Sequence, residues 1–140
     1  MNTFGNTISK VQHLKRSNAL RLCFDATAEQ SRTLELSAEL LRTHSPSAEV
    51  RQHGQPILVA GKAKVVLNSV EPVGHYGVRL MFDDGHNTGI YTWAYLLKLG
   101  VEQSQLWEQY RSALQDAGLS RYPDRAVVQL QLPNQKPKSE

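Results

Sequence analysis

The sequence has few of the features that mark several protein classes. It contains a single cysteine, Cys23, among 140 residues, so it can form neither an internal disulfide framework nor a zinc cluster of several thiolates. No apolar run approaches the roughly 20 residues that a membrane-spanning helix needs. The N-terminal stretch MNTFGNTISK lacks the basic start and the apolar core of a secretory signal. These absences predict one globular domain that works in the reducing cytoplasm, with no membrane partner.

Clustered basic residues are also scarce, although the formal net charge is +3. Lysine and arginine are spread along the chain, and only Lys15 and Arg16 are adjacent. A nucleic-acid-binding surface usually gathers basic residues, or aromatic residues between them. The composition therefore indicates a mildly basic, solvated surface, and we do not expect nucleic acid as a partner.

Catalytic motifs are absent as well, since no phosphate-binding glycine loop, HExxH, GxSxG or CxxC occurs. Titratable groups gather in one tight turn, where Asp83, Asp84 and His86 surround Gly85. Adjacent aspartates in a turn usually bond local backbone amides. Acid–base catalysis would need a third group and a pocket, and the sequence identifies neither. We therefore expect no enzyme activity.

Alternating apolar residues predict a mostly antiparallel sheet. The first two strands form a hairpin around the polar stretch KRSN, and Cys23 in the second strand is expected to be a small core residue. Asp84-Gly85 predicts a type I′ turn between the last two strands. The strands are expected at residues 8–14, 19–24, 33–36, 64–70, 76–82 and 88–91.

Capping residues mark the helices. Ser37 can cap a short helix, AELLRT, with Leu40 and Leu41 facing inward. Thr92 can begin a helix that Gly100 ends, and a further helix is expected at about residues 102–117, up to Gly118.

These elements predict an α+β fold of two layers, a small, mostly antiparallel sheet with helices packed on one face. The domain is expected to cover residues 1–119, and residues 120–140 to form a polar, disordered tail. Four aromatic residues at helical spacing are expected to pack in the core: Trp93, Tyr95, Trp107 and Tyr110.

Two phrases, LLRTHSPSAEVRQHG (Leu40–Gly54) and VEPVGHYGVRLMFDDGHNTGIYTWAYL (Val70–Leu96), occur in this order before Leu99-Gly100. They resemble the gamma-butyrobetaine hydroxylase-like N-terminal domain, which also exists as small stand-alone bacterial proteins of unknown function. The resemblance covers about residues 8–100. It implies a non-catalytic domain, because the iron- and 2-oxoglutarate-dependent catalytic domain of the hydroxylase is a separate unit that this chain lacks.

The resemblance also implies a structural zinc site, held in the family by a Cys-Pro-Cys-x-x-Cys loop and one histidine. The histidine matches His86, whereas the cysteines fall on Ser45, Ser47 and Val50. Serine is a poor zinc ligand and valine is none. We therefore predict a degenerate metal loop and no cofactor.

A looser zinc site remains the alternative. Its ligands would be His86, His44, Glu49 and His53, which lie in or beside the same loop and turn.

The function predicted from these observations is that of a protein-interaction or accessory module. Its candidate contact surfaces are the loop HSPSAEVRQHG and the turn DDGHNTG, with Arg42, Arg51, Asp84 and His86 as candidate binding residues. Surface ion pairs of the two arginines with Glu39 or Glu49 would explain them equally well.

The partner is expected to be an unidentified protein. Because the same domain is also fused to Mrp-like ATPases that handle iron–sulfur clusters, iron–sulfur assembly factors are candidates. The alternative function is a metal-binding or iron–sulfur-assembly accessory that uses His86 with other histidines.

Overall fold

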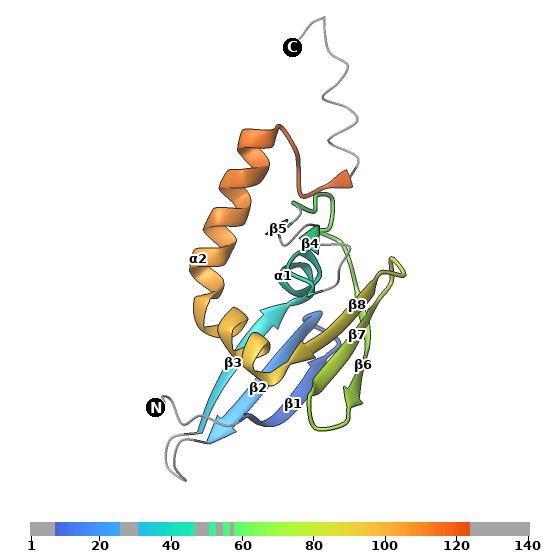
Figure 1. The fold of residues 1–140 in the computed structure, drawn as a ribbon, viewed down its shortest axis with the longest axis vertical. Coiled ribbons are helices and arrows are strands. Elements are labelled where there is room, and N and C mark those ends of the chain that lie inside the picture. The colour runs from blue at the N-terminus through green and yellow to red at the C-terminus, as the bar shows by residue number, and fades with distance from the viewer. Residues whose placement is uncertain (1–7, 26–30, 47–50, 53–54, 57, 124–140) are drawn as a thin grey trace, which may run out of the picture.

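A computed structural model describes residues 8–25, 31–46, 51–52, 55–56 and 58–123. It confirms the α+β class (Figure 1). The described strands form two three-stranded antiparallel sheets, ordered β1-β2-β3 and β6-β7-β8, and β4 and β5, of two residues each, form a separate pair. No helix in the described segments is both long and apolar enough to cross a membrane. The strands are β1 (Ile8–Leu14), β2 (Ala19–Asp25), β3 (Ser31–Ser37), β4 (Arg51–Gln52), β5 (Gln55–Pro56), β6 (Leu67–Val73), β7 (Gly77–Phe82) and β8 (Asn87–Thr92).

The first sheet and the short helix α1 (Ala38–Thr43) follow the predicted pattern. β1 and β2 pair as the expected hairpin, and the turn between them contains Asn18 at a φ of 56°. The Asn18 side chain also bonds Val65 O and Leu67 N, at 2.8 and 2.9 Å, so it joins the first hairpin to the start of β6. The Ser37 hydroxyl accepts a hydrogen bond from Leu40 N at 3.0 Å and caps α1.

The second sheet begins later than predicted, because β6 starts at Leu67 and not at residue 64. Val78, Leu80 and Phe82 of β7 face the core, as their alternation indicates. Tyr76, the first residue of the predicted strand, lies in the turn before β7 and is exposed.

The turn between β7 and β8 is not the predicted type I′ turn. Gly85 N donates to Phe82 O at 3.1 Å, which makes Asp83 and Asp84 the central residues. A type I′ turn needs a positive φ at both central residues, and within the described part of the chain Asn18 is the only such non-glycine residue. Gly85 follows the turn with a φ of 78°, as in hairpins that have a left-handed glycine after a type I turn.

The two predicted C-terminal helices form one helix, α2 (Trp93–Ala117). Thr92 caps its start and Gly118, at a φ of 70°, ends it, as predicted. The predicted break at Gly100 is wrong, because this glycine serves close packing against β3. A Cβ atom at Gly100 would lie 2.9 Å from Leu34 Cδ1, so the missing side chain allows the contact at a cost in helix propensity of about 1 kcal/mol.

The predicted core aromatic residues are anchored by polar atoms as well as by packing. Trp93 Nε1 donates to His75 O at 2.9 Å, and the Tyr95 hydroxyl donates to His44 O at 2.6 Å. Tyr110 is buried, and its hydroxyl donates to Val59 O. Trp93, Tyr95 and Trp107 are only partly buried and pack against the core. Cys23, also expected in the core, is likewise only partly buried, with Sγ 3.6 Å from Gln12 Oε1.

The packed part of the chain continues past residue 119, where the tail was expected to begin. Ser120 O accepts a hydrogen bond from Gly61 N at 2.9 Å. The Arg121 guanidinium bonds both carboxylate oxygens of Glu39, at 2.8 and 2.9 Å, and lies 5.1 Å from the centre of the Trp107 ring. Glu39 is buried, so this pair binds the segment after α2 to α1. The remainder of the predicted tail, residues 124–140, lies outside the described residues.

We predict that Gly77→Ala destabilises the domain much more than Gly85→Ala. An added Cβ at Gly77 would lie 2.0 Å from Tyr91 O and 2.8 Å from Thr92 Cα, and this backbone cannot move without breaking the β7–β8 pairing. We expect a loss of about 3 kcal/mol in the free energy of unfolding, measured by urea denaturation. An added Cβ at Gly85 would meet no atom within 4 Å, so the alanine variant should lose only about 1–2 kcal/mol, the cost of a left-handed conformation. Equal losses in the two variants would contradict the clash.

Candidate functional site

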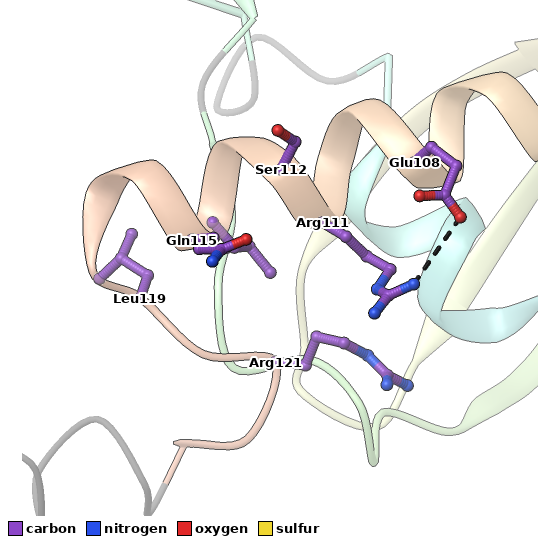
Figure 2. A pocket seen from close by; sticks show the side chains of 7 residues that line it. Glu108, Arg111, Ser112, Gln115, Leu119 and Arg121 are labelled. Atoms are coloured by element: carbon purple, nitrogen blue, oxygen red, sulfur yellow. Dashed lines mark ion pairs between the residues drawn. The ribbon is translucent and has the colours of Figure 1, made fainter.

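Two surface hollows provide the first test of where chemistry could occur. One, of about 480 Å³, lies against the C-terminal half of α2. Its charged groups are Glu108 and Arg111, which form an exposed pair at 3.7 Å, and Arg121, which bonds Glu39 (Figure 2). The other, of about 440 Å³, lies between β1 and β6 and is mostly apolar. Neither hollow is lined by the acid–base candidates of the DDGH turn.

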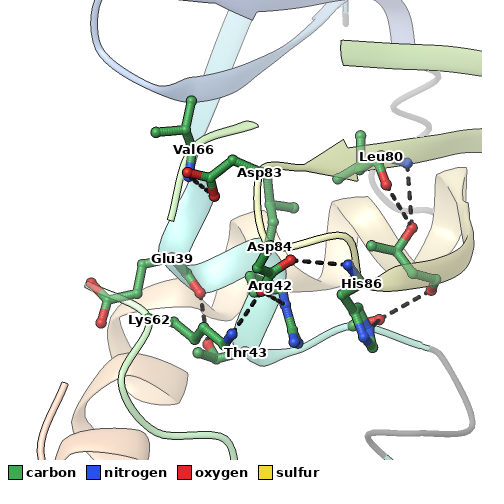
Figure 3. Close-up of polar contacts among 12 residues, drawn as sticks. Glu39, Arg42, Thr43, Lys62, Val66, Leu80, Asp83, Asp84 and His86 are labelled. Carbon is green, nitrogen blue, oxygen red and sulfur yellow. Dashed lines mark hydrogen bonds and ion pairs between the residues drawn. The ribbon is translucent and has the colours of Figure 1, made fainter. Parts of the chain in front are cut away.

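Asp84 is the centre of a polar network beside α1 (Figure 3). Its Oδ2 atom accepts hydrogen bonds from Arg42 Nε and Lys62 Nζ, each at 2.7 Å. Its Oδ1 atom accepts one from the His86 backbone N–H at 3.1 Å. A single carboxylate therefore joins α1, the segment before β6 and the β7–β8 turn.

The electrostatic environment keeps Asp84 ionised. Burial alone would raise the pKa of Asp84, but the hydrogen bonds from Lys62, from the His86 N–H and from Arg42 outweigh it and hold the pKa well below its usual range. A carboxylate with so low a pKa is a poor general base near neutral pH. The geometry therefore gives Asp84 a structural role.

The environment of Arg42 differs from the one expected from the sequence. The sequence suggested a surface pair with Glu39 or Glu49, but the side chain is 10% exposed and pairs with Asp84, while Glu39 bonds Arg121. Arg42 and Asp84 are separated by 42 residues, and no local pattern reports such a contact. Arg42 Nη1 is buried without a hydrogen-bond partner within the described residues.

Asp83 and His86 are also bonded within the protein. Asp83 Oδ1 accepts from Val66 N at 3.0 Å. His86 Nε2 lies 3.1 Å from Ser45 Oγ, and this hydroxyl donates to Thr88 O at 3.0 Å. Ser45 and Thr88 are fully buried. The loop after α1 and the β7–β8 turn therefore meet at Ser45 and His86, two of the positions that the resemblance assigns to zinc ligands.

His44 is engaged on another side of the loop. Its Nδ1 atom lies 3.1 Å from Leu40 O, and its ring packs edge-on against Tyr110 with centroids 5.9 Å apart. Burial lowers the pKa of His44, against the opposing effect of the Leu40 carbonyl. His44 is therefore explained as a neutral imidazole that bonds Leu40 O at the C-terminal end of α1.

The described donors do not fit the zinc site that the resemblance implies. No group of three or more His, Cys, Asp or Glu residues suited to one ion is found in the described segments. Ser45 offers a hydroxyl where a structural zinc needs a thiolate, imidazole or carboxylate. The other residues proposed for this loop, Ser47, Glu49, Val50 and His53, lie outside the described residues, as does the side chain of Arg51.

Lys62 and Thr88 are the members of the site that sequence reasoning missed. Lys62 lies outside every predicted strand and helix, in an irregular segment. Thr88 acts through its backbone carbonyl and its hydroxyl, for which the sequence carries no distinguishing signal.

Comparisons with known proteins give consistent results. The family model described as gamma-butyrobetaine hydroxylase-like, N-terminal, matches residues 11–97. Two proteins with NMR solution structures are 46% and 41% identical to the chain, with TM-scores of 0.74 and 0.69. These matches cover 91% and 86% of this chain, and 98% and 90% of the other chains.

A third similar structure is the crystal structure of a protein of unknown function of the DUF971 family from Acidithiobacillus ferrooxidans ATCC 23270. It is 38% identical, has a TM-score of 0.52, and the match covers 66% of this chain and 91% of that one. No curated protein matches the chain.

We predict that Asp84→Asn lowers the free energy of unfolding by about 2–4 kcal/mol, because Arg42 would remain buried without a counter-charge. The matched control is Glu35→Gln, which removes the acid of the exposed Arg21–Glu35 pair, whose side chains are 36% and 47% exposed. This control should cost less than about 1 kcal/mol. Urea denaturation of both variants at pH 7 measures the difference, and a small loss in both would show that Asp84 is dispensable.

We also predict that the advantage of the wild type over Asp84→Asn declines in acid. The pKa of Asp84 is lowered by folding, so its stabilisation is complete above the ordinary carboxyl pKa of about 4. Below that pH the unfolded chain takes up the proton first, and the stabilisation declines as the pH falls toward the folded-state pKa. Unfolding free energies of the two proteins between pH 7 and pH 2 should converge below about pH 4. A constant difference over this range would exclude the ion pair as its cause.

Proposed function

Because the chain belongs to the gamma-butyrobetaine hydroxylase-like N-terminal domain family, we propose that it is a non-catalytic accessory module that acts by binding another protein. The observation that carries the proposal is the internal use of the whole DDGH turn. Asp83 bonds Val66, Asp84 bonds two cations, and His86 lies against Ser45. Groups that hold the fold together are not available as acid, base or nucleophile.

The outer face of the second sheet supports a binding role. Val78 and Leu80 face the core, so the alternate residues of β7 face solvent. Met81 of β7 and Ile90 of β8 are 40% and 37% exposed on this outer face. Met81 is separated from the Asp83-Asp84 turn by one residue, which places the exposed apolar side chains next to the contact surface that the sequence suggested.

The partner class follows from the resemblance. Domains of this kind are fused to ATPases that handle iron–sulfur clusters, so iron–sulfur assembly factors of the reducing cytoplasm are the first partners to test. A thiolate-based cluster role for the chain itself is not supported, since Cys23 is its only cysteine.

We predict that the double variant Met81→Asp/Ile90→Asp loses at least about tenfold in partner capture, because two charges would have to be buried at the interface. The measurement is a pull-down with purified iron–sulfur assembly factors and with native extract, quantified by mass spectrometry. Val101→Asp is the matched control, because Val101 is an exposed apolar residue, 57% exposed, on α2.

Melting curves establish that both variants are folded. Capture that is equal for the wild type and both variants, or absent for all three, would refute this surface as the binding site.

A further inference from the structure

We propose that a hydrogen-bonded chain, His86–Ser45–Thr88, replaces in this protein the structural zinc that the family resemblance implies. The two ends of the family's site are still in contact, with Ser45 Oγ and His86 Nε2 3.1 Å apart. The inference concerns what holds the loop after α1 to the β7–β8 turn. It rests on membership of the family and is independent of whether the module binds a partner.

Ser45 connects His86 to β8. Its hydroxyl donates to Thr88 O at 3.0 Å and lies 3.1 Å from His86 Nε2. With its proton on Thr88 O, the hydroxyl accepts from the His86 tautomer that carries a proton on Nε2. In that tautomer Nε2 has no lone pair for a metal ion.

The contact distance fits a direct hydrogen bond. Zinc bound tetrahedrally by a cysteine sulfur at about 2.3 Å and a histidine nitrogen at about 2.0 Å separates these two atoms by roughly 3.5 Å. Here the serine oxygen and the imidazole nitrogen are 3.1 Å apart. Serine at this position thus contacts the histidine directly.

Burial makes the replacement effective. Ser45 and Thr88 are fully buried, so the hydrogen bonds form away from competing water. The same segment is held by the Tyr91 hydroxyl on Leu41 O and the Tyr95 hydroxyl on His44 O, each at 2.6 Å. Residues 41–45 are therefore attached to β8 and α2 by several bonds that need no metal.

A double-mutant cycle tests the chain of bonds in the natural protein. Ser45→Ala should lower the Tm by about 5 °C or more, because it leaves buried polar groups without a partner. His86→Ala should lower it less, and adding His86→Ala to Ser45→Ala should lower it no further, since the shared bond is already lost. Fully additive losses, or no loss in either variant, would overturn the proposal.

The wild-type imidazole provides a readout that does not depend on variants folding. Long-range ¹H–¹⁵N spectra should show a proton on His86 Nε2, unchanged by equimolar Zn²⁺ or by a chelator. Near-stoichiometric zinc in the natively purified protein, or a zinc-induced shift of Nε2, would overturn the proposal.

Restoring the family's thiolates is the complementary test. The variant S45C/S47C/V50C should bind about one zinc per chain by elemental analysis and should acquire a Tm that a chelator lowers. Adding His86→Ala should remove the zinc or weaken its retention, and C23S should not. Failure of the folded cysteine variant to bind zinc would show that Ser45 does not occupy a ligand position, and would leave the partner-binding proposal untouched.

Discussion

One carboxylate, that of Asp84, joins the parts of this domain that the sequence separates. Burying the Arg42 guanidinium costs desolvation energy, and only a nearby counter-charge offsets that cost. Asp84 supplies this charge to Arg42 and Lys62 at the same oxygen atom. The compensation is incomplete, because Arg42 Nη1 is buried without a partner in the described part of the chain. The position of α1 against the β7–β8 hairpin therefore depends on the Arg42–Asp84 pair.

Around the ion pair, hydrogen bonds to backbone carbonyls stabilise a helix that would not persist alone. α1 has six residues, fewer than an isolated helix needs. Tyr91, Tyr95 and Ser45 direct their hydroxyl groups at carbonyls of residues 41, 44 and 88. At the other end, Glu39 bonds Arg121, so the C-terminal segment contributes to the same region. The site is thus a structural junction, which agrees with a role in presenting a surface.

Features with a local cause could be predicted from the sequence. Ser37, Thr92 and Gly118 cap helices through atoms within a few residues, and strand alternation reports burial directly. Gly100 was misread because its reason lies in β3, where Leu34 approaches the helix. Arg42 was misread for the same kind of reason, since its partner lies 42 residues away. Long-range packing decided both, and one sequence carries no record of it.

The candidate site was predicted in part, and the resemblance supplied the part that local physics could not. It paired position 45 with position 86, and the structure places these residues in contact. The chemistry at the contact follows from the residue types, because a hydroxyl that donates to Thr88 O can accept a hydrogen bond from the imidazole without any metal ion. A loop that such bonds hold does not require a metal supply or a thiolate protected from oxidation. What this protein shares with its relatives is the scaffold, and the exposed face of its second sheet is where we look for its function.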